Sequence, residues 1–323
     1  MKIVFHGGNA ANFRGGFEAI LGSGHEIITL PDRIESAADR AAFESADVII
    51  GVKLSKDDPH PRALRLYHAP AAGTDAIDLA CLPPEAALCN AFGHEHAIAE
   101  YVMAALLARH VPLARADARL REGHWDFWAG RPGALRTELG AQTIGLLGFG
   151  HIGKAIALRA KAFGMRVSVC NRSPVPPDAL VDESYTLEAL GCFMGSADAI
   201  IVSLPLLPET RGIVGAPALS AMRKDAIILN VGRGPVIDEA ALFDVLSRNA
   251  IGGAIIDTWY QYPTPDQPEA LPSALPFHTL TNLVMTPHMS GWTNGTVRRR
   301  QETVAENIRR LARGEALLNA IRR

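Results

Sequence analysis

Residues 143 to 154 read TIGLLGFGHIGK, a short apolar run that leads into Gly148, Gly150 and Gly153. The apolar run is typical of a buried parallel strand, and residues 154–163 have helical composition. The G-x-G-x-x-G spacing suits a pyrophosphate, because the glycines permit a tight turn, a close approach to the backbone and helix packing on the strand. The anion then meets the N–H groups and the positive dipole of the helix. Since another strand-like run follows about 20 residues on, the stretch predicts dinucleotide binding.

Apolar runs alternate with helical segments on both sides of this stretch, which predicts parallel sheets covered on both faces. In the second half of the chain the strand-like runs are 144–147, 166–170, 199–203, 226–230, 253–256 and 284–286. In the first half they are 3–5, 26–30, 48–52, 64–68 and 86–89, with helical segments at 17–21 and 37–45. Six parallel strands in the second half indicate a doubly wound nucleotide-binding domain.

Two longer helical segments, 96–110 and 294–313, flank the second set of strands. A helix beyond the last strand most easily returns the chain to its first half. We therefore expect these helices to be the two crossings between domains, with the active cleft between them. The expected fold class is α/β, with a nucleotide-binding domain of residues 96–291 and a substrate-binding domain of residues 1–95 and 292–323.

The composition is that of an ordinary soluble protein, with 48% hydrophobic and 20% charged residues among 323 and a net charge of −2. This balance indicates neither nucleic-acid nor membrane binding, and no apolar run reaches the ~20 residues of a membrane span. The four cysteines form no C-x-x-C pair, and the chain enters a strand at Lys2 without a leader pattern. We expect a cytoplasmic protein with buried, reduced Cys89 and Cys170 and no metal site. The basic run 298–300 is expected on solvated helix surface.

Residues 112–136 contain Trp125, Phe127 and Trp128 among several glycines and prolines. Pro112 is expected to end or kink the preceding helix. Three aromatic residues are too many for an exposed loop, so they pack either on their own subunit or on a partner. We favour an arm that is buried in a homodimer.

Four segments together resemble the D-isomer-specific 2-hydroxyacid dehydrogenase family, which includes glyoxylate and hydroxypyruvate reductases, phosphoglycerate dehydrogenases and formate dehydrogenases. They are 146–153 (LLGFGHIG), 203–210 (SLPLLPET), 229–238 (LNVGRGPVID) and 285–291 (MTPHMSG), and the resemblance covers essentially the whole chain. It implies a Rossmann domain inserted in a flavodoxin-like substrate domain. The implied activity is hydride transfer between a nicotinamide cofactor and a small 2-keto or D-2-hydroxy acid, with glyoxylate or hydroxypyruvate reduction expected first.

Arg233 and His288 are the candidate catalytic residues that the resemblance implies. Arg233 follows an apolar strand, and a guanidinium offers a planar, permanently charged fork of donors that suits a 2-keto acid. His288 also follows a strand, and it would protonate the alkoxide that forms as the hydride reaches the carbonyl carbon. His94 and His96 compete for this assignment, but capping or cleft lining suits them better.

The resemblance also implies which residues bind the cofactor and the substrate. The cofactor candidates are Gly148, Gly150, His151, Ile152, Gly153, Asn171, Arg172, Ser173, Leu204, Pro205, Thr210, Val231, Gly232, Asp257, His288 and Gly291. Asp257 would receive the nicotinamide carboxamide. The substrate candidates are Lys53, Ala72, Gly73 and Arg233. Ala72 and Gly73 would hold a carboxylate by their backbone N–H groups, whereas Lys53 is equally compatible with plain surface.

The end of the second Rossmann strand departs from the pattern of NAD-specific members, which carry an acidic residue there that bonds the ribose hydroxyls. This chain has Asn171, followed by Arg172 and Ser173. Asparagine does not repel a 2′-phosphate, and the arginine and serine offer charge and hydrogen-bond donors. We therefore expect NADP(H) to be preferred, with NAD(H) as a possible second cofactor.

The partner of the histidine is the second departure. The family usually has an aspartate, four intervening residues and a glutamate that pairs with the histidine; counted from Asp257, that position is Tyr262. A neutral hydroxyl orients His288 by a hydrogen bond but supplies no full charge, so Tyr262 is a third candidate catalytic residue. Asp238 and Glu269 are the alternative partners.

Two other functions stay open. Formate dehydrogenases place glutamine at the position of Tyr262, and the flanking residues 263–265 also resemble them, so formate-like hydride transfer without proton transfer is one alternative. A non-enzymatic NAD(P)-sensing regulator on the same fold is the other, although retention of Arg233 and His288 argues against it. Substrate preference is expected to depend on Trp259, Tyr260 and Trp292.

Overall fold

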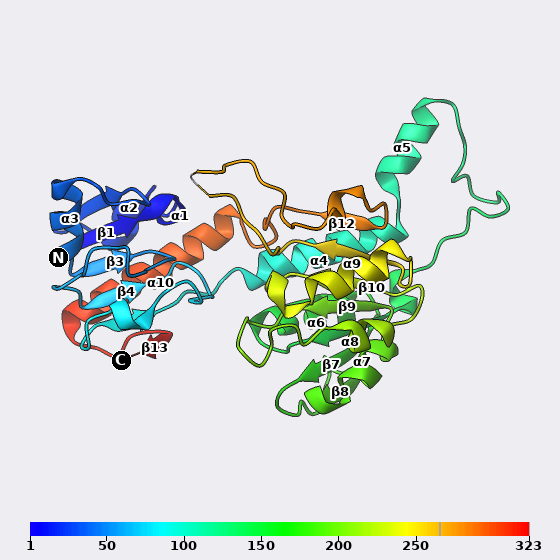
Figure 1. Ribbon diagram of the computed structural model, residues 1–323. Helices are drawn as coiled ribbons and strands as arrows, with labels where there is room; N and C mark the ends of the chain where they lie inside the picture. The colour runs from blue at the N-terminus through cyan, green and yellow to red at the C-terminus, as the bar shows by residue number, and fades with distance from the viewer. Residues whose placement is uncertain (265, 323) are drawn as a thin grey trace. The chain divides into compact units, whose positions relative to one another are not determined.

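The computed structural model describes residues 1–264 and 266–322; Pro265, Arg323 and the side chain of Arg322 lie outside the described residues. The chain forms two compact units (Figure 1). The first combines Met1–Gly93 with Thr293–Arg323, and the second is His94–Trp292. Each unit is built around its own sheet.

The first unit contains a six-stranded sheet in the order β13-β5-β4-β3-β1-β2. Its strands are β1 (Lys2–His6), β2 (Glu26–Leu30), β3 (Val48–Ile50), β4 (Leu66–His68), β5 (Ala87–Cys89) and β13 (Ala320–Arg322). Its helices are α1 (Gly7–Ala11), α2 (Phe17–Leu21), α3 (Ala37–Glu44), η1 (Leu79–Cys81) and α10 (Asn294–Arg313). The first five strands are parallel in the order 2-1-3-4-5, which confirms the flavodoxin-like expectation. The antiparallel edge strand β13 was not expected.

Alternate residues of β1 point to opposite faces of this sheet, and each face has its own apolar core. Ile3 and Phe5 pack in one core with Phe17 of α2 and Ile308 of α10. Val4 belongs to the core on the other face. The sheet is thus covered on both sides, as expected for parallel strands.

Helix α10 begins where Thr293 accepts a hydrogen bond from the Thr296 N–H and ends at Gly314, which has a left-handed φ of 68°. The expectation that the arginines at 298–300 all lie on solvated surface is wrong. Arg300 is buried, because this amphipathic helix turns one residue of the three towards its unit. Arg299 is half-buried and donates from Nε to the carbonyl oxygen of Gly93 at 2.7 Å.

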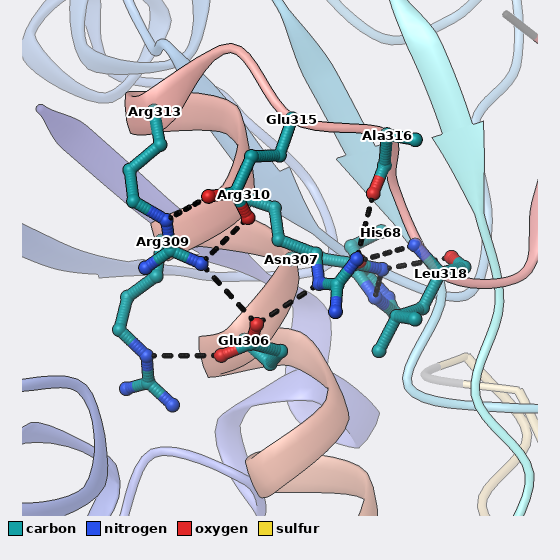
Figure 2. Close-up of polar contacts among 9 residues, drawn as sticks. All are labelled: His68, Glu306, Asn307, Arg309, Arg310, Arg313, Glu315, Ala316 and Leu318. Carbon is teal, nitrogen blue, oxygen red and sulfur yellow. Dashed lines mark hydrogen bonds and ion pairs between the residues drawn. The ribbon is translucent and has the colours of Figure 1, made fainter.

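A buried polar network ties α10 to β4 and to the segment before β13 (Figure 2). His68 and Asn307 are fully buried. The Nδ1 atom of His68 lies 3.2 Å from the Ala69 carbonyl oxygen, which can only accept, so Nδ1 carries the ring hydrogen and Nε2 accepts from Asn307 Nδ2 at 2.9 Å. Asn307 also bonds both backbone groups of Leu318, at 2.7 and 3.0 Å. Burial lowers the pKa of His68 to about 4.

The second unit contains a seven-stranded sheet in the order β12-β11-β10-β9-β6-β7-β8. Its strands, all parallel, are β6 (Thr143–Leu147), β7 (Arg166–Asn171), β8 (Glu183–Thr186), β9 (Ala199–Val202), β10 (Ile227–Asn230), β11 (Gly253–Ile256) and β12 (Leu283–Met285). Its main helices are α4 (Glu95–His110), α5 (Leu113–Arg121), α6 (His151–Ala162), α7 (Leu190–Ser196), α8 (Ala216–Ser220) and α9 (Glu239–Ser247). This is the doubly wound Rossmann arrangement, whose strand order reverses between β6 and β9.

The expected count of six strands in this sheet is wrong by one, because β8 was missed. Residues 183–186 read ESYT and form a half-exposed edge strand without an apolar run, so the sequence carries no strand signal there. Cys89 and Cys170 are buried, as expected.

Helix α4 ends before Pro112 and α5 starts after it, at an angle of 45°. The bend lies at the proline, as expected, and α5 with the following loop projects from the second unit (Figure 1). Trp125 and Trp128 are 63% and 60% exposed, so neither is packed in the core of its own unit. Among the described residues no single helix has the length and apolar composition of a membrane span; α4 and α5 reach them only when counted together across their bend.

Candidate active site

Each of the three glycines between β6 and α6 meets a different constraint. Gly148 has a φ of 99°, which favours glycine. A Cβ on Gly153 would lie 2.4 Å from the Gly148 carbonyl oxygen, whereas a Cβ on Gly150 would have no heavy atom within 4 Å. Gly150 is the N-cap of α6, whose first residues are His151 and Ile152. This open helix N-terminus fits a pyrophosphate.

The cofactor candidates Leu204, Pro205 and Thr210 follow β9, the strand beside β6 at the reversal of strand order. The Thr210 hydroxyl donates to the Pro205 carbonyl oxygen at 2.6 Å and accepts from the Leu207 N–H at 2.8 Å. The loop is thereby closed into a fixed turn. Dinucleotides bind at this reversal point in doubly wound sheets, and these residues lie beside it.

Beyond β7, the Asn171 side chain donates to the Ser173 carbonyl oxygen at 3.1 Å, and Arg172 and Ser173 are exposed. Asn171 pairs with Thr186, the last residue of β8, and Glu188 follows on the same edge. Hydrogen bonds from the Thr186 side chain and from its own backbone N–H lower the pKa of the Glu188 carboxyl. The sequence did not reveal this acid as a neighbour, because β8 carries no strand signal.

Arg233 follows β10 and is half-buried between two glycines that cannot be larger. A Cβ on Gly232 would lie 2.6 Å from the Leu204 carbonyl oxygen, and one on Gly234 would lie 2.3 Å from the Trp259 carbonyl oxygen. The arginine is therefore clamped between the backbones that follow β9 and β11. Its Nη1 atom donates to the Gly232 carbonyl oxygen at 3.0 Å.

Another backbone bond fixes the same segment. The N–H of Val231, the residue before this glycine pair, donates to the Val202 carbonyl oxygen of β9 at 3.1 Å. The loop that carries the arginine thus leaves β10 in register with β9.

His288 follows β12 and has a φ of 58°, a left-handed conformation that few residues other than glycine adopt. The fully buried Asp257 carboxylate holds the loop in this shape. It accepts hydrogen bonds from the Thr286 hydroxyl at 2.6 Å, the Met289 N–H at 2.9 Å and the Ser290 N–H at 3.0 Å. An ionised carboxylate offers about four acceptor sites, and these three hydrogen bonds occupy most of them.

The structure brings Tyr262 and His288 together. The Tyr262 hydroxyl oxygen lies 3.0 Å from His288 Nδ1 and accepts from the Trp259 N–H at 3.0 Å. The alternative partners are placed otherwise: Asp238 caps α9 by accepting from the Ala241 N–H, and Glu269 is an exposed loop residue. A tyrosine hydroxyl thus stands beside the histidine.

Tyr101 and Thr286 extend this site and were not anticipated from the sequence. The Thr286 hydroxyl has one hydrogen, which goes to the Asp257 carboxylate, so Tyr101 on α4 donates to Thr286 Oγ1 at 2.8 Å. The Trp259 indole N–H donates to the Thr286 carbonyl oxygen at 2.8 Å. No local pattern marks Tyr101, because its partner lies 185 positions away.

Two of the three aromatic residues expected to shape substrate preference are packed in the core. Trp259 is buried, and Tyr260 stacks on Phe277 with ring centroids 6.2 Å apart. Burial raises the pKa of Tyr260, so its hydroxyl stays protonated. Trp292 is 47% exposed and is the one of the three that presents a large surface.

The competing histidines stand at the start of α4. His94 occupies the N-cap position without a side-chain capping hydrogen bond, so the expected capping is not observed, and His96 is exposed. A Cβ on Gly291 would lie 3.3 Å from the His94 Cβ. Gly291 thus lets the loop after His288 pass close to α4.

The substrate candidates of the first unit lie on loops after its parallel strands. The loop after β4 is tied by Asn90, whose side chain donates to the Ala72 carbonyl oxygen at 2.7 Å, and Gly73 follows on the same half-buried turn. After β3, Lys53 has an exposed side chain, and its carbonyl oxygen accepts from the Tyr67 hydroxyl at 2.6 Å. Burial raises the pKa of Tyr67.

The donor sets of the second unit fit a nicotinamide dinucleotide: an open glycine turn at a helix N-terminus, and polar groups at the ends of neighbouring strands. Within the part of the chain that the structure describes, no group of three or more histidine, cysteine or acidic residues could hold a metal ion.

Comparison with known proteins agrees with this geometry. Residues 103–290 match the family model described as D-isomer specific 2-hydroxyacid dehydrogenase, NAD binding domain. Glyoxylate reductase of Aeropyrum pernix is 34% identical over 272 residues, 80% of this chain and 77% of that protein. D-3-phosphoglycerate dehydrogenase of Methanocaldococcus jannaschii is 32% identical over 288 residues, 86% of this chain. This match spans 52% of the length of the Methanocaldococcus protein. A separate match to D-3-phosphoglycerate dehydrogenase of Mycobacterium tuberculosis spans 40% of that protein's length.

Two crystal structures resemble the whole chain. A D-isomer specific 2-hydroxyacid dehydrogenase of Xanthobacter autotrophicus, in complex with NADPH and MES, superposes with a TM-score of 0.80 at 26% identity. The similarity covers 99% of this chain and 97% of that one. A family member of Aeromonas salmonicida gives a TM-score of 0.81 at 25% identity, covering 99% and 98%.

Proposed function

This chain belongs to the D-isomer specific 2-hydroxyacid dehydrogenase family, and we propose that it transfers a hydride between NADP(H) and a small 2-keto acid or D-2-hydroxy acid. Glyoxylate and hydroxypyruvate are the keto acids proposed first. One observation carries the proposal: Arg233, clamped between two backbones, and His288, held by Asp257, stand at the ends of β10 and β12. That sheet also carries the open Gly150 turn.

In the second unit, Arg233 binds the substrate carboxylate through its planar fork of donors. His288 gives a proton to the carbonyl oxygen during reduction and takes it back during oxidation. A nicotinamide dinucleotide, when bound, supplies or accepts the hydride. Asp257 holds the His288 loop and offers its remaining acceptor site to the carboxamide.

In the first unit, the proposal assigns carboxylate binding to the backbone N–H groups of Ala72 and Gly73. Lys53 adds a positive charge on the neighbouring loop. Both assignments rest on the turn that Asn90 ties and on the Lys53 backbone that Tyr67 holds.

The cofactor preference is proposed to come from Arg172 and Ser173 at the end of β7. The NADPH in the Xanthobacter crystal structure supports a family fold that accepts the 2′-phosphate. Because one charge-assisted contact is lost, Arg172→Ala is expected to weaken NADPH binding about ten- to a hundredfold, whereas NADH binding should hardly change. Arg166→Ala, at the opposite end of the same strand, is the matched control. A wild-type preference for NADH would contradict the proposal.

A spectrophotometric panel tests the reaction itself. Oxidation of NADPH and NADH is followed with glyoxylate, hydroxypyruvate and pyruvate, and reduction of NADP⁺ and NAD⁺ with D-3-phosphoglycerate and formate. The proposal expects the highest kcat/KM with NADPH and glyoxylate or hydroxypyruvate. Formate oxidation without keto-acid reduction would contradict the proposed function and identify a formate dehydrogenase activity instead. Cofactor binding without any turnover would favour the regulator.

A further inference from the structure

The Tyr262 hydroxyl is held by a backbone group that can only donate. The Trp259 N–H donates to the Tyr262 oxygen at 3.0 Å, and the same oxygen lies 3.0 Å from His288 Nδ1. Trp259 is itself fixed, because it is buried and its indole N–H donates to the Thr286 carbonyl oxygen at 2.8 Å. The two ends of the tyrosine–histidine contact are therefore anchored to neighbouring strand ends.

A phenolic oxygen that accepts an amide hydrogen still has its own hydrogen to give, and a neutral imidazole nitrogen accepts it. We propose that Tyr262 donates this hydrogen to Nδ1, so that resting His288 is neutral with its ring hydrogen on Nε2, and that Tyr262 passes its proton to the ring during reduction. A glutamate at this position would act in the opposite sense. A carboxylate only accepts, so it places the ring hydrogen on Nδ1 and favours the charged ring.

The inference rests on the proposed reduction of a keto acid. As the new C–H bond forms, the π electrons of the carbonyl group become a lone pair on the alkoxide oxygen. The Nε2–H bond of His288 breaks and the alkoxide gains that proton, while Nδ1 takes the hydroxyl proton of Tyr262. The remaining phenolate keeps the hydrogen bond from Trp259 and, because Tyr262 is 46% exposed, regains a proton from water. An alkoxide is a stronger base than a phenolate, so the net transfer is downhill.

Other charged groups of this unit stand near the pair and are unchanged in the test variants. Asp257 binds the N–H groups of the two residues that follow His288, and Arg233 stands after β10. At the start of α4, His94 lies against Gly291, and Glu95 is 3.7 Å from the His94 ring. Differences between Tyr262 variants therefore report on Tyr262.

The tautomer is measured first, without cofactor or substrate. In ¹⁵N spectra of the full chain labelled in its histidine rings, the His288 signals are identified by their loss in His288→Gln. At pH 9 the wild type is expected to show a protonated Nε2 and an unprotonated Nδ1, and Tyr262→Glu the reverse. A protonated Nδ1 in the neutral wild-type ring overturns the inference, whatever the enzyme reduces.

The proton transfer is measured by kcat and KM for keto-acid reduction in wild type and Tyr262→Phe. At pH 6 the ring of the variant can take a proton from water, so its kcat is expected to stay within about threefold of wild type. At pH 9 kcat is expected to fall about a hundredfold with little change in KM, a loss typical of a missing acid–base group. An equal loss at both pH values would mean a merely structural tyrosine and overturn the relay. If the wild type reduces no keto acid, the proposed function fails, while the ¹⁵N spectra still decide the tautomer.

Discussion

Gly150 and Gly153 show how one motif combines a binding requirement with a folding requirement. A Cβ on Gly153 would meet the Gly148 carbonyl oxygen at 2.4 Å, so Gly153→Ala is expected to lower the free energy of unfolding by roughly 1–3 kcal/mol. A Cβ on Gly150 meets no atom within 4 Å, so Gly150→Ala should leave the melting temperature unchanged. It should weaken cofactor binding about tenfold or more, because the added methyl group would occupy the space where the backbone approaches the pyrophosphate. Thermal melts and cofactor titrations of both variants separate the two effects. Equal melting temperatures would contradict the assignment.

His68 makes stability depend on pH through a single buried ring. Its pKa is about 4 in the folded chain against 6.5 in a model peptide, so the unfolded chain binds a proton that the folded chain does not. The stabilisation is therefore full above pH 6.5 and is lost as pH falls towards 4. Protonation would also place a hydrogen on Nε2, which faces the side-chain amide of Asn307, and Nε2 could then no longer accept the hydrogen bond from that amide (Figure 2).

Between pH 7.5 and 5.5 this group should account for about 1.4 kcal/mol of lost unfolding free energy. His68→Gln keeps an acceptor for Asn307 without titrating, so its urea-unfolding free energy should fall by that much less over the same interval. An identical decrease in both proteins would show that His68 is not held neutral.

At the scale of elements, α4, β11 and β12 are joined by a chain of hydrogen bonds that runs from Tyr101 through Thr286 to Asp257. Removing the first donor leaves the others intact, so Tyr101→Phe should cost about 1 kcal/mol of stability. Thr286→Val leaves a buried carboxylate with one donor fewer, so it should cost more, about 1–3 kcal/mol. It should also lower kcat, because the His288 loop loosens.

Thr286→Ser retains the hydroxyl and serves as the control for this chain. Denaturant unfolding and steady-state kinetics of the three variants give the comparison. If Tyr101→Phe proved as damaging as Thr286→Val, the direction of the chain would be wrong.

At the scale of the molecule, the arm made by α5 and residues 122–138 carries a set of large exposed apolar side chains. These are Leu113, Leu120, Trp125, Trp128 and Leu135. The arm has internal order, since Asp126 binds Arg119 at 2.7 Å and Arg131 at 3.0 Å. Large apolar side chains exposed along one segment mark interaction surfaces, so we propose that a second copy covers this arm in a two-fold dimer.

Light scattering at micromolar concentration is expected to give twice the mass of 34.6 kDa. The double variant Trp125→Ser with Trp128→Ser should shift the protein towards monomer, because it removes two buried anchors of that interface. Phe163→Ser, which changes an exposed aromatic residue outside the arm, should leave the dimer intact. A monomeric wild type would refute the arm proposal.

Strands and helices with strong local patterns could be predicted from the sequence, and those without could not. The run before Gly148 is continuously apolar and the segment 294–313 has helical character, and both elements lie where expected. Edge strands such as β8 and β13 have weak patterns, because each pairs with a neighbour on one side only. The expectation that Arg300 lies on solvated surface was wrong for a related reason. The charge of a side chain does not tell which side of a helix packs against a core.

The sequence by itself determined the family, the two-sheet architecture and the identity of Arg233, His288 and Tyr262 as candidates, because motif and spacing are local properties. Only the tertiary structure decided that Tyr262 and His288 are 3.0 Å apart. Only it showed that the Asp257 carboxylate accepts two backbone hydrogen bonds from the loop of His288 and that Trp259 faces the core. Such contacts join residues that follow different strands, so no local pattern in the sequence predicts them. The packing of the strands fixes the distances, and the donor and acceptor groups that meet there decide the direction of each hydrogen bond.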